Sequence, residues 1–279
     1  METGTAIKDM VRSKYAEIAH QTQEQNASSC CGAGGCSTVD YTIFAEDYTK
    51  LKGYVADADL ALGCGVPTEF ALIEEGHTVV DLGSGAGNDA FVARAIAGES
   101  GKVIGIDMTP EMIAKARENA DKLNFNNVEF RLGDIENIPI AANRADVIIS
   151  NCVLNLVPDK LRAFQEMFRI LKPGGHFSVS DIVLRGELPE PLRKDAEMYA
   201  GCVSGAIQED DYLRMLSEVG FTNIVVQKSR PVILPDDILS AYLTPDEITS
   251  MNAGGQGIIS TTVYGEKPAS ACEPGSGCC

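Results

Sequence analysis

A glycine-rich loop that directly follows a short apolar strand constrains the fold of this chain more than any other feature. The apolar segment 77–82 runs into Asp81-Leu-Gly-Ser-Gly-Ala-Gly87, and residues 88–97 then have a helical pattern. A strand, a tight glycine turn and a helix in this order are typical of nucleotide-binding folds, although the loop alone is a weak signal. Ligands of open parallel sheets bind at the carboxyl ends of the strands, where strand order reverses. The loop therefore predicts a binding site at that edge.

Strands and helices alternate over most of the chain. After the loop we expect further strands at 102–107, 128–132, 145–150 and 176–182, with helices between them at 110–123 and 158–171. Such alternation predicts βαβ units and a doubly wound, mostly parallel Rossmann-like α/β sheet. After about residue 183 the pattern changes to helices at 189–199 and 210–219, a strand at 222–227, and a segment at 257–266 that alternates like an edge strand.

This change predicts a smaller α+β domain at the carboxyl end. We expect four parts: an amino-terminal helix and Cys/Gly-rich loop at 1–39, the ligand-binding domain at 40–185, a domain covering the substrate at 186–268, and a Cys-rich tail at 269–279. Glycine, serine and cysteine dominate the loop and the tail, and such segments lack the apolar residues of a core.

The charge of the chain excludes some partners. Forty acidic residues against 23 basic ones give a net charge of −17. A negative field of this size argues against binding to nucleic acid and to anionic membranes. We find no apolar run of the roughly 18 residues that cross a bilayer, and no secretory signal at the amino terminus. A cytoplasmic enzyme acting on a small molecule is therefore expected.

Three carboxylates stand at or just after the ends of successive predicted strands. Asp81 precedes the glycine turn, Asp107 ends the next strand, and Asp134 follows the third. A carboxylate at Asp81 would repel a phosphate but suits the ammonium of an amino-acid moiety. Asp107 is placed to bind ribose hydroxyls, and Asp134 to accept from an adenine amino group. Each could instead be a helix cap or a solvated turn residue, but the three together favour a nucleoside site.

Nine cysteines, an odd number, cannot all pair within one chain. In a cytosolic protein they favour catalytic, redox or metal-binding roles. Only Cys64, Cys152 and Cys202 lie in the body of the chain, and glycines flank Cys64, which favours an irregular, exposed backbone there. Cys152 could simply complete an apolar strand as a small buried side chain. Structural zinc is disfavoured because these three cysteines show no paired spacing.

The three carboxylates together with the loop resemble the class I S-adenosylmethionine-dependent methyltransferases over residues 77–183. The resemblance implies S-adenosyl-L-methionine as cofactor, with Asp107 on the ribose, Met108 packed on the adenine, and Asp134 with Ile135 reading the adenine edge. Asn151 would border the methionine part. The implied cofactor-binding residues are Asp81, Gly83, Ser84, Gly85, Gly87, Asp107, Met108, Asp134, Ile135 and Asn151.

The cysteine motifs carry a narrower resemblance. Gly63-Cys-Gly65, Ser150-Asn-Cys-Val-Leu-Asn-Leu156 and Gly201-Cys-Val-Ser-Gly205 resemble the motifs of arsenite S-adenosylmethionine methyltransferases, as does the amino-terminal helix followed by Cys30-Cys-Gly32. The resemblance implies that Cys64, Cys152 and Cys202 bind As(III), with Cys30, Cys31 or Cys36 taking part in turnover. It also implies a thiol-conjugated substrate and an external thiol or dithiol reductant.

Trithiolate As(III) keeps a lone pair, so its methylation requires no general base. Two alternatives stay open. A methyltransferase for an organic acceptor such as a quinone or phenol requires a base near the methyl group, and the sequence offers no clear candidate. A metalloid-binding sensor would use the thiols without turnover and would not need a donor site. The Gly/Cys-rich termini, with Cys272, Cys278 and Cys279 in the tail, could capture arsenic or bind metals incidentally.

Overall fold

A computed structural model describes residues 4–21, 46–187, 205–233, 239–240, 243–246, 248–249 and 257–269. Several sequence predictions fall outside these ranges: the helix at 189–199 and seven of the nine cysteines, which are Cys30, Cys31, Cys36, Cys202, Cys272, Cys278 and Cys279. The division into domains stays a prediction.

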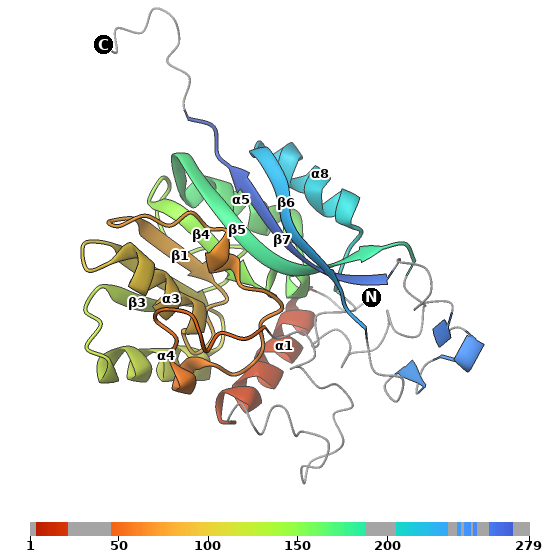
Figure 1. Cartoon of the computed structure of the whole chain (residues 1–279), viewed down its shortest axis with the longest axis horizontal. Helices are drawn as coiled ribbons and strands as arrows, with labels where there is room; N and C mark the ends of the chain where they lie inside the picture. Colours follow the sequence, from red (N-terminus) through yellow and green to blue (C-terminus); the bar gives the residue numbers. More distant parts are fainter. Residues whose placement is uncertain are drawn as a thin grey trace, which may run out of the picture.

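A seven-stranded sheet in the order β3-β2-β1-β4-β5-β7-β6 forms the centre of the molecule (Figure 1). Strands β1 to β5 run parallel, and β7 is antiparallel to both of its neighbours. The strands are β1 (Thr78–Leu82), β2 (Lys102–Asp107), β3 (Val128–Leu132), β4 (Ala145–Asn151), β5 (Leu171–Arg185), β6 (Thr222–Pro231) and β7 (Gly257–Glu266). The predicted doubly wound, mostly parallel α/β fold is confirmed.

Helices cover both faces of the sheet. They are α1 (Gly4–Ala19), α3 (Asn88–Ala97), α4 (Pro110–Lys122), α5 (Lys160–Ile170) and α8 (Glu209–Val219). Side chains of α1, α3 and α4 pack in one apolar cluster with Val79 of β1, whereas those of α5 and α8 pack in a second cluster with its neighbour Val80. Adjacent strand residues point to opposite faces, so the two clusters are the two sides of the sheet.

The element boundaries follow local chemistry. Helix α4 begins at Pro110 as predicted, because proline fits the first helical turn. Helix α5 begins at Lys160, two residues later than predicted, because the Asp159 side chain caps it by accepting from the Arg162 N–H at 2.9 Å. Strand β5 is longer than the predicted 176–182, since it pairs with β7 along residues 176–185.

One strand prediction is wrong. Residues 257–266 were expected to form an edge strand, but β7 lies between β5 and β6 and is buried along nearly its whole length. The outer edge belongs to β6, whose residues alternate between exposed and half-buried. Antiparallel pairing with β5 on one side and β6 on the other covers the edges of β7. Strands β7 and β6 thus extend the parallel sheet beyond β5.

Helix α1 lies beside α4, on the side of the sheet that carries α3 (Figure 1). Its Val11 and Ile18 are buried. At its carboxyl end the Lys115 ammonium of α4 donates to the carbonyl oxygens of Ala19 and Gln21, at 3.0 and 3.3 Å. In the described ranges no helix is long and apolar enough to cross a membrane.

Candidate active site

The sheet order places the glycine loop and Cys152 at the same point. The chain passes outward from β1 through β2 to β3, then returns to place β4 on the other side of β1, so strand order reverses between β1 and β4. The glycine loop follows β1 and Cys152 follows β4, and a cavity opens there. Its walls contain the loop residues 83–86, the end of β2 from Ile106 to Met108, and residues 151–153. A ligand is expected at such a reversal point.

Backbone hydrogen bonds fix the glycine loop against the end of β2. The N–H groups of Gly83 and Ser84 donate to Ile106 O at 2.7 and 2.9 Å. The Gly85 N–H donates to Asp107 Oδ2 at 3.0 Å. Gly83 has φ +71°, and a Cβ there would lie 2.3 Å from Cγ2 of Val153, the residue that follows Cys152. Only glycine allows the loop to approach the residues after β4 so closely, so the glycine loop directly contacts the segment that carries Cys152.

Three carboxyl groups line the cavity: Asp81 and Asp89, which are buried, and Asp107, which is half-buried. Burial first, and then the charges of Asp89 and Asp107, raise the pKa of Asp81 well above its usual value. Burial likewise raises the pKa of Asp89, to about 6, and that of Asp107. Asp81 Oδ2 is buried and has no hydrogen-bond partner among the described residues.

This acidic cluster fits a cationic ligand. An unpaired buried carboxylate is costly, and a positive group beside it removes that cost. S-adenosylmethionine carries an ammonium and a sulfonium, so the residues present suit it. The structure places Asp81 in the wall of the cavity, as the sequence predicts. Its role as the ligand of the cofactor ammonium stays a prediction.

Asp134 is engaged by its own surroundings. Its Oδ1 accepts from the Glu136 N–H at 2.9 Å, and its Oδ2 lies 2.7 Å from the Lys8 ammonium of α1. Lys8 also contacts the Glu136 carboxylate. Asp134 and Ile135 line the cavity with Met108. These residues can therefore be reached by a ligand in the cavity, and their adenine contacts stay a prediction. Asp134 also has the turn role that the sequence allowed, because its side chain accepts from the Glu136 N–H.

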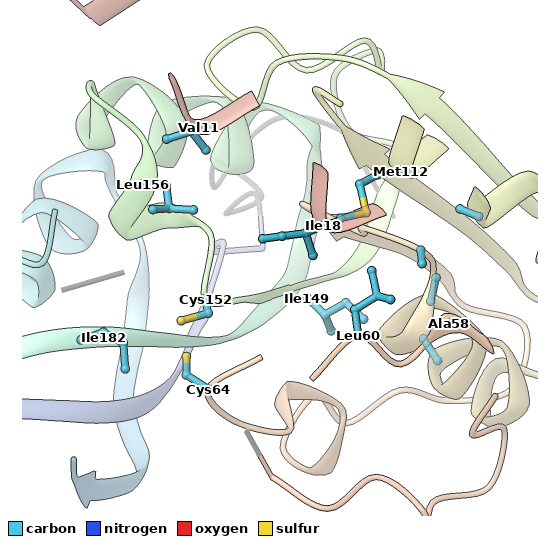
Figure 2. Close-up of a cluster of buried hydrophobic side chains, with 14 of the residues drawn as sticks. Val11, Ile18, Ala58, Leu60, Cys64, Met112, Ile149, Cys152, Leu156 and Ile182 are labelled. Carbon is cyan, nitrogen blue, oxygen red and sulfur yellow. The ribbon is translucent and has the colours of Figure 1, made fainter. Parts of the chain in front are cut away.

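The two thiols in the described part of the chain face one another. Cys64 and Cys152 are both buried, and Figure 2 shows their sulfur atoms directed toward each other beside Ile182. Cys152 has φ +59°, in the left-handed region, and its N–H donates to Ser180 O at 2.7 Å. Such strain in a non-glycine residue costs about 1–3 kcal/mol and concentrates at functional sites. It turns Cys152 out of the line of β4.

The expected exposure of Cys64 is wrong. The whole residue, backbone included, is buried, although glycines flank it. The Cys64 N–H donates to Asn151 Oδ1 at 2.9 Å, and the Cys64 carbonyl accepts from Ser260 Oγ of β7 at 2.5 Å. The glycines serve close packing instead: a Cβ at Gly65 would lie 2.5 Å from Ser180 Oγ.

Most of the predicted donor residues line this one cavity. Asp81, Gly83, Ser84, Gly85, Asp107, Met108, Asp134, Ile135 and Asn151 do so, together with Cys152. Gly87 does not; its αL backbone begins α3, and a Cβ there would meet Phe91 and Phe130. Cys64 follows the lining residue Gly63. Cys202, Cys30, Cys31 and Cys36 lie outside the described residues.

Sequence reasoning missed several residues of the site. Lys8, Val11 and Tyr15 of α1 line the cavity, as does Tyr48. Asp89 lies in the first turn of α3, and the only sequence signal for it is a carboxylate two residues after the last glycine of the loop. A helix is predicted at the amino terminus, but its sequence does not indicate which surface it covers.

Comparisons with known proteins agree with this geometry. A family model described as "Methyltransferase domain" matches residues 73–220. The arsenite methyltransferase of Halobacterium salinarum is 41% identical over 275 residues, covering 94% of this chain and 67% of that protein. The chain belongs to the arsenite methyltransferase family. It is a methyltransferase, and S-adenosylmethionine is its cofactor.

Two further proteins, one arsenic methyltransferase and one quinone methyltransferase, match different shares of the chain. The crystal structure of an arsenic(III) S-adenosylmethionine methyltransferase from Chlamydomonas reinhardtii superimposes with a TM-score of 0.61 and 34% identity, covering 72% of this chain and 66% of that one. A ubiquinone/menaquinone biosynthesis C-methyltransferase of Cronobacter sakazakii is 34% identical over 131 residues, which cover 46% of this chain and 51% of that protein. The second match is limited to less than half of the chain.

Proposed function

We propose that this protein methylates trivalent arsenic bound as a cysteine thiolate complex. The observation that carries the proposal is the pair of buried thiols at the donor cavity, Cys152 in its wall and Cys64 facing it. The relatives named arsenite methyltransferases support arsenic as the acceptor. Thiolates are the ligands that a soft centre such as As(III) prefers.

The donor half of the proposal assigns one role to each acidic residue. Asp81, with an unpartnered buried oxygen, would hold the ammonium of S-adenosylmethionine. Asp107 would bind the ribose while it holds the glycine loop, and Met108, Asp134 and Ile135 would surround the adenine. When bound, the cofactor supplies an electrophilic methyl group on a sulfonium.

The acceptor half needs positioning more than proton transfer. As(III) with three thiolate ligands is neutral and keeps a lone pair, so nothing has to be deprotonated at the methylation step. Orientation of the acceptor beside the methyl group can contribute about 7–11 kcal/mol. His77 directly precedes β1, and His176 stands four residues before Ser180, whose carbonyl accepts from the Cys152 N–H; neither histidine lines the cavity. Neither histidine serves the site as a base.

The remaining ligands and the reductant belong to the same proposal. Cys202 would supply the third thiolate, and Cys30, Cys31 or Cys36 would take part when the arsenic returns to the trivalent state. Two thiolates then give up one electron pair to arsenic and form a disulfide, which an external dithiol reduces. The substrate would arrive as a thiol conjugate, and both arsenite and monomethylarsenite would be accepted. The process would serve arsenic detoxification in the cytoplasm.

The alternative acceptor is a small organic molecule. Similarity to quinone methyltransferases over 131 residues favours it for the donor half alone. Methyl transfer to a phenol would use a general base, and Asp89 is a buried carboxyl that lines the cavity and whose pKa burial raises to about 6. The paired thiols have no use in that reaction.

A direct assay separates these functions. The purified chain is incubated with S-adenosylmethionine, a dithiol and either arsenite or a panel of quinols and phenols, and the products are separated by chromatography. We expect methylated arsenic and no methylated phenol. A methylated organic product without methylated arsenic would replace the proposal with the alternative. Stoichiometric arsenic binding with no methylated product of either class would identify a binding protein.

Serine substitutions test the thiols themselves. Serine keeps the approximate volume of cysteine but stays protonated at neutral pH, so Cys152→Ser should lower the arsenite methylation rate by about two orders of magnitude or more. Cys64→Ser should do the same for arsenite but spare monomethylarsenite, which needs only two thiolates. Cys272→Ser in the tail is the matched control and should keep the natural rate. A folded Cys152→Ser protein that methylates arsenite at that rate would refute the thiolate mechanism.

A further inference from the structure

One asparagine connects the two thiols of the described chain. Asn151 is the last residue of β4 and precedes Cys152. Its Oδ1 accepts from the N–H of Cys64 at 2.9 Å and, less closely, from that of Gly65 at 3.3 Å. Its Nδ2 lies 2.8 Å from Gly65 O. The residue that precedes one thiol therefore binds the backbone that carries the other.

Two buried partners hold the Asn151 amide. Its Nδ2 lies 2.8 Å from the Tyr48 hydroxyl and 3.0 Å from Asp89 Oδ2. The Tyr48 hydroxyl lies 2.8 Å from both Asp89 Oδ1 and Gly65 O. Tyr48 and Asp89 are less than a tenth exposed. Buried polar networks whose members are all hydrogen-bonded favour one arrangement of the groups they join.

The packing around the Cys64 loop allows little movement. A Cβ at Gly63 would lie 2.5 Å from Asn151 Nδ2, so the backbone of the loop lies directly against the amide. On the other side Ser260 of β7 donates to the Cys64 carbonyl. Asp89 belongs to the first turn of α3, directly after the glycine loop. The network therefore joins the donor loop, the end of β4 and the Cys64 loop.

We propose that Asn151, held by Tyr48 and Asp89, is a positioning residue that sets Cys64 opposite Cys152, so that both thiolates can bind one arsenic atom. This role differs from the predicted contact between Asn151 and the methionine part of the cofactor. It rests on the proposed function for the identity of the ligand, but the test below requires no methyl transfer.

The test uses phenylarsine oxide as the probe. Its arsenic(III) exchanges one oxygen for two thiolates, and the two thiol protons leave with the oxygen as water, so tight binding reports a correctly spaced pair. In the full chain, serine replaces Cys30, Cys31, Cys36, Cys202, Cys272, Cys278 and Cys279, so that Cys64 and Cys152 are the remaining cysteines. Circular dichroism and thermal unfolding establish that each variant folds.

In this background we compare Asn151→Ala with Asn127→Ala. Asn127 is the matched control: its amide also joins separate segments, donating to Gly98 O and Gly101 O at 2.9 Å each and accepting from Arg94, away from the thiols. A merely structural loss would lower the melting temperature in both variants. We expect the dissociation constant of phenylarsine oxide to rise about tenfold or more for Asn151→Ala and less than about twofold for Asn127→Ala. Tyr48→Phe should fall between them.

Two results would overturn the proposal: a folded Asn151→Ala protein that binds the probe as tightly as its background, or one that loses only affinity for S-adenosylmethionine in calorimetry. The second would restore the cofactor role. If the Asn151→Ala variant of the natural chain is folded, its KM for arsenite should rise more than its KM for the donor. If the probe affinities follow the expected order but the natural chain does not methylate arsenite, the proposed function is rejected and the positioning role of Asn151 is kept.

Discussion

At the scale of single residues, Asp107 performs a structural task that its predicted ligand role did not include. Its Oδ2 accepts from Gly85 and its Oδ1 accepts from the Thr109 N–H at 2.8 Å, so it joins the glycine loop to the start of α4. Asp107→Ala should weaken S-adenosylmethionine binding at least tenfold, because hydrogen bonds to a charged acceptor contribute about 1.5–3 kcal/mol each. Calorimetry measures this, and arsenite affinity should change little.

Asp107→Asn is the informative companion variant. The amide oxygen can keep one of the two backbone hydrogen bonds, so donor affinity should lie between that of the natural chain and that of Asp107→Ala. Unchanged donor affinity in Asp107→Ala would show that the carboxylate neither binds the ribose nor shapes the loop.

At the scale of elements, α1 lines the cavity with Lys8, Val11 and Tyr15 and is held at both ends. Lys8 contacts the carboxylates of Asp134 and Glu136 near its start, and Lys115 holds its last carbonyls. Lys8→Ala should release the first part of the helix and speed S-adenosylmethionine dissociation by about two- to fivefold, since partly exposed ion pairs contribute about 0–1 kcal/mol. Stopped-flow displacement measures that rate.

The control for α1 is Lys122→Ala, which removes the ion pair of Lys122 with Glu118 at 2.9 Å, a pair on the exposed side of α4. Its donor dissociation rate should equal that of the natural chain. Equal rates for Lys8→Ala and Lys122→Ala would mean that α1 lies over the cavity without limiting release of the donor.

At the scale of the whole molecule, a buried carboxyl in the middle of β5 makes stability depend on pH. Asp181 is fully buried, and burial raises its pKa to about 7 against the attraction of Lys160 and hydrogen bonds that include the Ile182 N–H at 3.0 Å. The folded state keeps this proton up to about pH 7, whereas the unfolded chain releases it near pH 3.8. Asp181 therefore destabilises the fold increasingly as pH rises through that interval.

Asp181→Asn removes this titration while keeping an oxygen that accepts from Ile182. Its gain in stability over the natural chain should be larger at pH 8 than at pH 5, by about 2–3 kcal/mol, since one pKa unit corresponds to about 1.4 kcal/mol. Thermal unfolding at both pH values measures the change. The exposed Glu99→Gln is the control and should show no such difference. An equal gain at both pH values would contradict the raised pKa.

The sequence by itself determined the order and kind of most elements. The signals for these elements are local: apolar strands of five to seven residues, a glycine turn after β1 and a proline at the start of α4. Each depends on the steric preferences of neighbouring residues in the chain. Asp81, Asp107 and Cys152 could be placed at the site because each stands within one residue of the end of a parallel strand, and those ends share one edge.

Only the tertiary structure decided what lies opposite these residues. The inner position of β7, the burial of Cys64 and the contact of Lys8 with Asp134 all depend on pairing between segments that are distant in the chain. Lys8 and Asp134 are 126 positions apart, and Cys64 and Ser260 are 196 positions apart. Asn151 illustrates the reason. Its chain position predicts a place at the cavity, but its partners Tyr48, Cys64 and Asp89 come from other segments, and hydrogen bonds between segments depend on packing that no local pattern contains.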